Sequence, residues 1–169
     1  GLGTPLGLQI NGEGGPLIKN YKDKTWSALS LPWISIGYES KLTPLQLLAF
    51  YNAVANNGRM VQPRIVREVR HSGQLVKSFP VEVMRDSIAS PVALSKARAM
   101  MEGVVQHGTA SVLNKSPFKI AGKTGTAQIN NPKFGYDKGH RSYQASFVGY
   151  FPADRPKYSC IVVVYAPSN

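Results

Sequence analysis

The chain has 169 residues, 43% of them hydrophobic, which is long enough for one domain with a real core. Its formal net charge of +11 favours anionic partners such as nucleic acid, lipid surfaces or acidic polymers. The basic residues are scattered and no aromatic-interleaved basic motif is present, so we expect no specific nucleic-acid binding. The single cysteine, Cys160, excludes an internal disulfide, and no apolar stretch approaches the roughly 20 residues of a membrane span.

The first part of the chain is rich in loop-forming residues. Glycines recur throughout residues 1–20, together with Pro5 and Pro16, which is typical of turns. The chain starts without a methionine and without an element that would anchor it, so we expect a cut inside a larger domain. Residues 21–31 are polar around Trp26 and predict no regular structure.

Two helices are predicted by one signal, an N-cap hydroxyl followed by proline at the first helical position. The first lies within residues 43–58, from its Thr-Pro start to its Asn-Gly end, and the second within residues 90–108, from Ser-Pro to His-Gly. Between them, residues 63–79 predict a β-hairpin with its turn at Ser72-Gly73. Thr109 is expected to cap one more short turn.

The last third of the chain predicts strands. The stretch from Ile120 to about Ile129 has two glycines, two threonines and no helical rhythm. A long link over residues 130–143 leads to strands at residues 146–151 and 158–165, whose short connection favours antiparallel pairing. The fold class is therefore α+β, with helices packed on an antiparallel sheet. Cys160 begins an apolar run and is expected to be buried and structural rather than reactive.

The strand at residues 120–129 carries the candidate site. Side chains alternate along a strand, so Thr124 and Thr126 share a face, while Gly125 between them lets a ligand backbone come close. Lys123 falls on the opposite face, so a site that uses all three side chains must lie along the strand edge or on a twisted strand. A cation with two hydroxyls suits a carboxylate, and an extended peptide can add to a free strand edge. A backbone N–H near Thr126 could also serve an oxyanion.

The same stretch has two other interpretations. An ordinary sheet strand with a surface lysine is the simplest reading of a bare Lys-Thr-Gly, because three-residue motifs recur by accident. A phosphate-binding loop would need a glycine five positions before Gly122, and that position is Pro117. The sequence therefore excludes the nucleotide reading and leaves the other two open.

Several motifs, in order across nearly the whole chain, resemble the C-terminal part of the transpeptidase domain of class B penicillin-binding proteins. They are Ser-Ile-Gly-Tyr at 35–38, Leu-Thr-Pro-Leu-Gln at 42–46, Ala-Asn-Asn-Gly at 55–58, Gly-Thr-Ala at 108–110, Ala-Gly-Lys-Thr-Gly-Thr-Ala-Gln at 121–128 and Ser-Phe-Val-Gly-Tyr-Phe-Pro at 146–152. The sequence around Ser35 and Tyr150 is more similar to the division-type enzymes than to the elongation type. The resemblance implies that residues 1–169 are the C-terminal portion of a single domain with the penicillin-binding transpeptidase or serine β-lactamase-like fold.

The resemblance also implies a chemistry. A serine attacks the D-alanyl-D-alanine bond of a peptidoglycan stem peptide, the last D-alanine leaves, and an amine from a neighbouring stem resolves the acyl-enzyme into a cross-link. β-Lactam antibiotics mimic the D-Ala-D-Ala end and trap the serine. Of the three family motifs, only Lys-Thr-Gly matches here, as Lys123, Thr124 and Gly125. By that match Lys123 supplies positive potential, Thr124 and Thr126 offer hydroxyls to the substrate carboxylate, and the Thr126 backbone N–H is an oxyanion donor. No metal ion or cofactor is implied.

The chain departs from the family pattern in two ways. It contains no Ser-x-Asn, and its one Ser-x-x-Lys, from Ser116 to Lys119, lies too close before Lys123 and is interpreted as an accident. We therefore expect the nucleophile, its lysine base and the middle motif upstream of this chain, and a final sheet-covering helix downstream. Alone, the chain is expected to be inactive.

The resemblance further implies partners and a compartment. The partners are cell-wall polymerase and divisome membrane proteins, and the catalytic domain faces the outer (periplasmic) side of the cytoplasmic membrane, tethered by a helix. A β-lactam-sensing or wall-peptide-binding domain without catalysis is the alternative function. The link over residues 130–143 is expected to border the cleft and to influence acceptor access.

Overall fold

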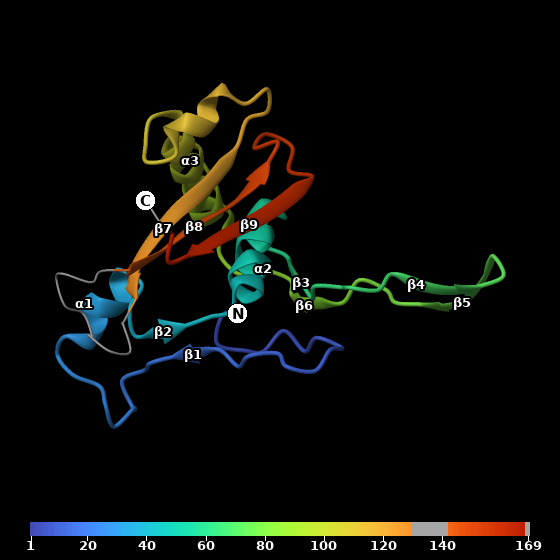
Figure 1. Ribbon diagram of the computed structural model, residues 1–169, viewed down its shortest axis with the longest axis horizontal. Coiled ribbons are helices and arrows are strands. Elements are labelled where there is room, and N and C mark those ends of the chain that lie inside the picture. Colours follow the sequence, from blue (N-terminus) through green and yellow to red (C-terminus); the bar gives the residue numbers. More distant parts are fainter. Residues whose placement is uncertain (130–141, 168–169) are drawn as a thin grey trace.

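A three-stranded antiparallel sheet with two helices packed against it forms the centre of the fold (Figure 1). The computed structural model describes residues 1–129 and 142–167. The sheet has the order β7-β8-β9, with β7 at Ala121–Ile129, β8 at Ser142–Phe151 and β9 at Tyr158–Tyr165. This confirms the predicted α+β class and the antiparallel pairing.

The register of the sheet is continuous along all three strands. β7 pairs with β8 from Ala121 opposite Tyr150 to Ile129 opposite Ser142, and β8 pairs with β9 up to the short turn that joins them. β8 starts four residues earlier than predicted, so the end of the expected link, residues 142–143, belongs to the strand. The rest of that link, residues 130–141, lies outside the described residues, and the expectation that it borders a cleft stays a prediction.

Helices α2 (Pro44–Ala55) and α3 (Pro91–Gln106) form where the cap signals predict them. Thr43 closes a full capping box, because its hydroxyl accepts from the Gln46 backbone N–H at 3.2 Å and its own N–H donates to the Gln46 side chain at 2.8 Å. The Ser90 hydroxyl caps α3 by accepting from the Ala93 N–H at 3.3 Å. α2 is followed by Asn57 and Gly58 with φ of 55° and 90°, the left-handed conformation that ends many helices.

One cluster of buried side chains joins both helices to the sheet. Its members come from the end of α2, from α3, from the start of β7, from the end of β8 and from the turn before β9. They are Val54, Ala55, Leu94, Met101, Ala121, Tyr150 and Ala153. A second cluster packs α2 on the N-terminal segment through Leu6, Ala49, Ala53 and Met60. Both helices therefore cover the same face of the sheet.

The prediction that Cys160 is buried is wrong, since its side chain is exposed. Burial alternates along β9: Ser159 lies on the side of α2, where its hydroxyl donates to the Asn52 side chain at 3.2 Å, while Cys160, Val162 and Val164 point the other way. No element of the described chain covers that second face, so Val162 stays 53% exposed. No helix among the described residues is long and apolar enough to span a bilayer.

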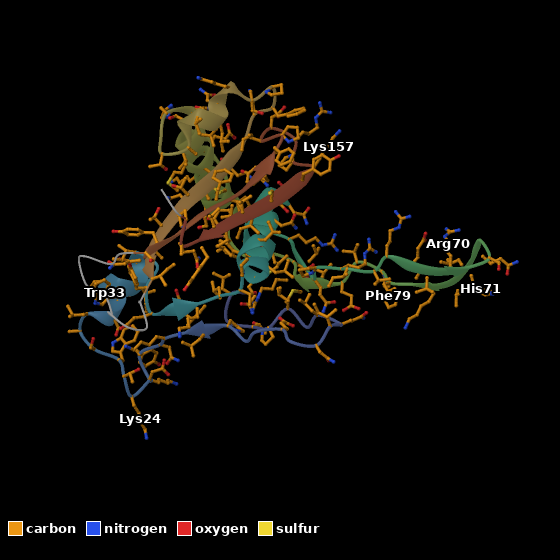
Figure 2. The ribbon with its side chains drawn as sticks, in the orientation of Figure 1. Lys24, Trp33, Arg70, His71, Phe79 and Lys157 are labelled. Carbon is orange, nitrogen blue, oxygen red and sulfur yellow. The ribbon has the colours of Figure 1, made fainter. Side chains whose placement is uncertain are left out.

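The predicted hairpin is confirmed, although it is shorter than expected. Its strands are β4 (Glu68–His71) and β5 (Gln74–Ser78), joined by Ser72 and Gly73 with φ of 47° and 81°, as a tight two-residue hairpin turn requires. The hairpin projects away from the rest of the fold, with its side chains extending on both sides (Figures 1 and 2). Within the described chain, the main contacts of each hairpin strand are with the other strand of the hairpin.

The remaining elements are short. β1 (Leu17–Ile18) pairs with β2 (Ser40–Lys41), and β3 (Met60–Val61) pairs with β6 (Val83–Arg85). Helix α1 (Ser30–Ser35) was not predicted, because no side chain caps its start. A 3₁₀ helix, η1, spans Ser111–Lys115 between α3 and β7.

Candidate functional site

β7 is an edge strand whose exposed part begins at the candidate site. Among the described residues it pairs only with β8, so its other edge is free. Ala121 is buried in the cluster that includes both helices, Gly122 is buried against β8, and from Lys123 onward the strand emerges at the surface. Gly122 lies opposite Gly149, and a Cβ there would come within 2.6 Å of the Val148 carbonyl oxygen. The two glycines therefore let β7 and β8 approach closely just before the site.

The lysine and the first threonine meet at the strand edge. Although alternation places Lys123 and Thr124 on opposite faces, the Lys123 side chain folds back along the strand. Its Nζ lies 2.7 Å from the Thr124 carbonyl oxygen and 3.4 Å from the Thr124 hydroxyl. This contact brings Lys123 and Thr124 together at the strand edge, and the expectation that a site using Lys123 and both threonines lies there stays a prediction. A fixed positive charge and a hydroxyl thus stand beside one another on an edge that could pair with an extended chain.

The next two site residues complete this exposed stretch. Gly125 and Thr126 are both exposed, and Gly125 lies opposite Ser146 of β8. A Cβ at Gly125 would lie 2.6 Å from the Ser146 hydroxyl, which donates to the Gly125 carbonyl at 3.4 Å. The backbone at this position is therefore open toward the solvent and closely packed toward β8.

Thr109 is a member of this site that the sequence reasoning missed. Its hydroxyl oxygen lies 2.7 Å from the hydroxyl oxygen of Thr124, although 15 residues separate them in the chain. The prediction that Thr109 caps a short turn is wrong, because the residue that precedes η1 is Ala110 and no side chain caps that helix. The sequence signal was the Gly-Thr-Ala motif, which showed that Thr109 belongs to a family pattern and did not show what it touches.

The isolated Ser-x-x-Lys match lies in the loop before β7. The Ser116 hydroxyl accepts a hydrogen bond from the Phe118 backbone N–H at 3.2 Å, which is a local turn contact. The Lys119 backbone carbonyl is bonded to the Ala153 N–H at 2.8 Å. No hydrogen bond joins the two side chains in the part of the chain that the structure describes, which supports the interpretation of the match as accidental.

Beyond Thr126, the end of β7 borders a groove against β1, β2 and the segment after α1. Gln128 and Glu39 line it, and both have one buried polar side-chain atom with no partner among the described residues. The other Glu39 oxygen binds Lys19 at 2.9 Å, and the hydrogen bond from Lys19 lowers the pKa of the Glu39 carboxyl. No group of three or more metal-ligating side chains occurs in residues 1–129 and 142–167.

Comparison with known proteins gives consistent matches over the full length. The family model "Penicillin binding protein transpeptidase domain" matches residues 1–169. Penicillin-binding protein PbpB of Mycolicibacterium smegmatis is 34% identical over 100% of this chain and 26% of its own length. Peptidoglycan D,D-transpeptidase FtsI of Buchnera aphidicola is 28% identical over 99% of this chain and 28% of its own.

The fold matches solved structures as well. Penicillin-binding protein 3 of Mycobacterium tuberculosis, crystallised with aztreonam, superposes with a TM-score of 0.83 at 29% identity, over 100% of this chain and 38% of that one. The chain spans about a quarter of the length of the curated relatives that it matches.

Proposed function

Because the chain belongs to the family of penicillin-binding protein transpeptidase domains, we propose that it supplies the substrate-binding strand of a peptidoglycan D,D-transpeptidase. The family match confirms the resemblance found in the sequence. We infer that residues 1–169 are the C-terminal portion of one such domain, and that the nucleophilic serine, its lysine base and the middle motif lie in the part that precedes them.

The observation that carries this proposal is the ammonium of Lys123 beside the hydroxyl of Thr124 on a free strand edge. A stem peptide that adds to this edge would bring its terminal carboxylate to Lys123, Thr124 and Thr126, where charge-assisted hydrogen bonds are available. Exposed Gly125 would let the peptide backbone approach without a side chain in the way.

The chemistry is an acyl transfer in two steps. The serine oxygen bonds to the carbonyl carbon of the penultimate D-alanine, the carbon–nitrogen bond breaks, and the last D-alanine leaves as the amine with the proton that the serine gave up. An amine nitrogen from a neighbouring stem then bonds to the ester carbon, the ester carbon–oxygen bond breaks, the proton that the amine loses goes to the serine oxygen, and the new amide is the cross-link. The Thr126 backbone N–H is the oxyanion donor from this chain, and the other comes from the nucleophile's own N–H.

The proposal extends to the setting of the intact protein. The relatives include a protein named peptidoglycan D,D-transpeptidase FtsI, and a structural neighbour holds the β-lactam aztreonam. We infer that the intact protein binds β-lactams and stem peptides and works with a cell-wall polymerase and divisome membrane proteins. Its catalytic domain would lie on the outer face of the cytoplasmic membrane.

The test compares acylation of the intact protein by a fluorescent penicillin with that of its Lys123→Ala variant. Loss of a charge-assisted contact is worth about 1.5–3 kcal/mol, so we expect acylation to slow by about 10- to 150-fold. Lys157→Ala, which removes an equally charged, exposed side chain from the turn between β8 and β9, should acylate at the wild-type rate (Figure 2).

Three results would contradict parts of this proposal. Rapid labelling of the Lys123→Ala variant would remove Lys123 from the mechanism. Absence of labelling in the intact wild-type protein would reject the transpeptidase. Acylation without any turnover of a peptide substrate would instead support a β-lactam sensor. The chain produced alone should gain no penicilloyl mass.

A further inference from the structure

Thr109 is held in place by the backbone at the end of α3. The Ala110 N–H donates to the Val104 carbonyl at 3.0 Å, and the Ser111 N–H donates to the Gly108 carbonyl at 3.1 Å. Gly108 packs so closely on the last turn of α3 that a Cβ would lie 2.8 Å from the Val104 Cα. The turn is therefore fixed on both sides of Thr109, and its exposed side chain is presented to β7 from a rigid support.

The hydrogen bonds around the Thr124 hydroxyl can be counted. A hydroxyl has one proton to donate and two lone pairs that accept. The Lys123 ammonium can only donate, so its 3.4 Å contact occupies one lone pair of the Thr124 oxygen. The Thr109 contact, at 2.7 Å the usual length for two hydroxyls, then has two possible directions.

The two directions have different consequences for a ligand. If Thr124 donates to Thr109, the only proton of Thr124 is used inside the protein. If Thr109 donates to Thr124, both lone pairs of Thr124 are filled, and its proton must point toward the solvent side of the strand edge. A carboxylate accepts and never donates, so it selects the second direction.

We propose that Thr109 is a positioning residue that donates to the Thr124 hydroxyl and thereby commits the Thr124 proton to the terminal carboxylate of the substrate. The inference rests on the proposed function, since it concerns the same strand and the same ligand group. It assigns to the segment after α3 a role in recognising the anionic end of the ligand. Thr109 acts through Thr124 and does not need to touch the ligand.

The test uses the intact protein and two ligands, benzylpenicillin and its methyl ester, which lacks the free carboxylate. The second-order acylation rate is followed by mass spectrometry of the penicilloyl adduct. Loss of one hydroxyl contact in Thr109→Val should slow acylation by benzylpenicillin about five- to tenfold, and that by the ester by less than about twofold. Thr109→Ser, which keeps the hydroxyl, should restore the benzylpenicillin rate.

Two controls separate orientation from packing. Ser111→Ala removes an exposed hydroxyl from the same segment, and it should leave both rates unchanged. Thr109→Ala is the second variant without a hydroxyl and should reproduce the ligand dependence of Thr109→Val.

The inference is overturned if the Val and Ala variants lose both ligands equally, if neither loses either ligand, or if Thr109→Ser is as slow as Thr109→Val. Its failure can be told apart from failure of the proposed function. If only this inference fails, the wild-type protein is still acylated and the predicted ligand dependence of the variants is absent. If the proposed function fails, the wild-type protein forms no adduct.

Discussion

Arg98 joins the two core helices, and its removal gives the sharpest test of the fold. From α3 its guanidinium reaches the C-terminal end of α2. Its Nε and Nη2 donate to the Val54 carbonyl at 2.9 and 2.6 Å, and Nη2 donates to the Ala55 carbonyl at 2.8 Å. Backbone N–H groups donate to the carbonyls of Asn52 and Ala53. Arg98 supplies donors for the next two carbonyls, those of Val54 and Ala55.

The expected loss can be worked from these contacts. Hydrogen bonds that involve a charged group contribute about 1.5–3 kcal/mol each, and a cation at a helix C-terminus adds about 0.3–1 kcal/mol. Arg98 is half-exposed and water can replace part of this, so we expect Arg98→Ala to cost about 2–4 kcal/mol in local stability. Arg98→Lys keeps the charge without the forked donor geometry and should recover about half of that loss.

Hydrogen exchange in the intact protein measures this loss at the right place. The reporters are the N–H groups of Asn56 and Gly58, which bond to the end of α2 at 2.8 and 2.7 Å. In Arg98→Ala they should exchange about 30-fold faster or more, because each tenfold corresponds to about 1.4 kcal/mol. Lys96→Ala, on the same helix with an exposed side chain, is the matched control and should exchange at the wild-type rate.

Exchange within about twofold of wild type in Arg98→Ala would show that the carbonyls find other partners, and it would refute the reasoning. An equal acceleration in Lys96→Ala would also refute it, because the effect would then come from the charge of α3 rather than from the contacts.

The remaining predictions concern Tyr150, Gly122 and Glu39, in and around the sheet. The Tyr150 hydroxyl is buried without a partner among the described residues, so Tyr150→Phe should leave the free energy of unfolding unchanged or raise it by up to about 1 kcal/mol in a denaturant titration. Burial also raises the pKa of Tyr150 above that of an unfolded tyrosine, so the free energy of unfolding should fall as the pH rises beyond about 10, and Tyr150→Phe should weaken this pH dependence. Gly122→Ala forces a Cβ against the backbone of β8 and should lower stability by about 1–3 kcal/mol, whereas Gly15→Ala, which meets no neighbouring atom, should not; equal melting temperatures for the two would contradict the close approach. The lowered pKa of Glu39 means that its stabilising contribution is present at neutral pH and is lost as the solution becomes acidic through that pKa; Lys19→Met should move the pKa up toward its ordinary value in an NMR titration, and an unchanged titration would exclude Lys19 as the cause.

Local signals predicted the elements well. A threonine or serine followed by proline marks the start of α2 and of α3, and Ser72-Gly73 marks the hairpin turn. In each case the residues that decide the structure are neighbours in the chain. The residues proposed for the candidate site, Lys123, Thr124, Gly125 and Thr126, are likewise consecutive, and they fall on one strand as predicted. α1 carries no such signal and was missed.

Contacts between distant residues could not be predicted in this way. Thr109 meets Thr124 only because the turn after α3 packs beside β7, and Arg98 reaches a carbonyl 44 residues away. The prediction that Cys160 is buried was wrong for a related reason. The run around it is apolar at successive positions, so the sequence does not reveal which set of side chains faces the helices.

The hairpin of β4 and β5 offers a site for insertion or labelling. Because it is held by its own pairing and its turn stands far from β7, insertion of a short epitope or a fluorophore at Ser72-Gly73 should leave the sheet undisturbed. A dye placed there would report the rotational motion of the protein and the approach of other molecules without blocking the free edge of β7. The same exposure makes the turn a preferred place for a protease to cut or an antibody to bind.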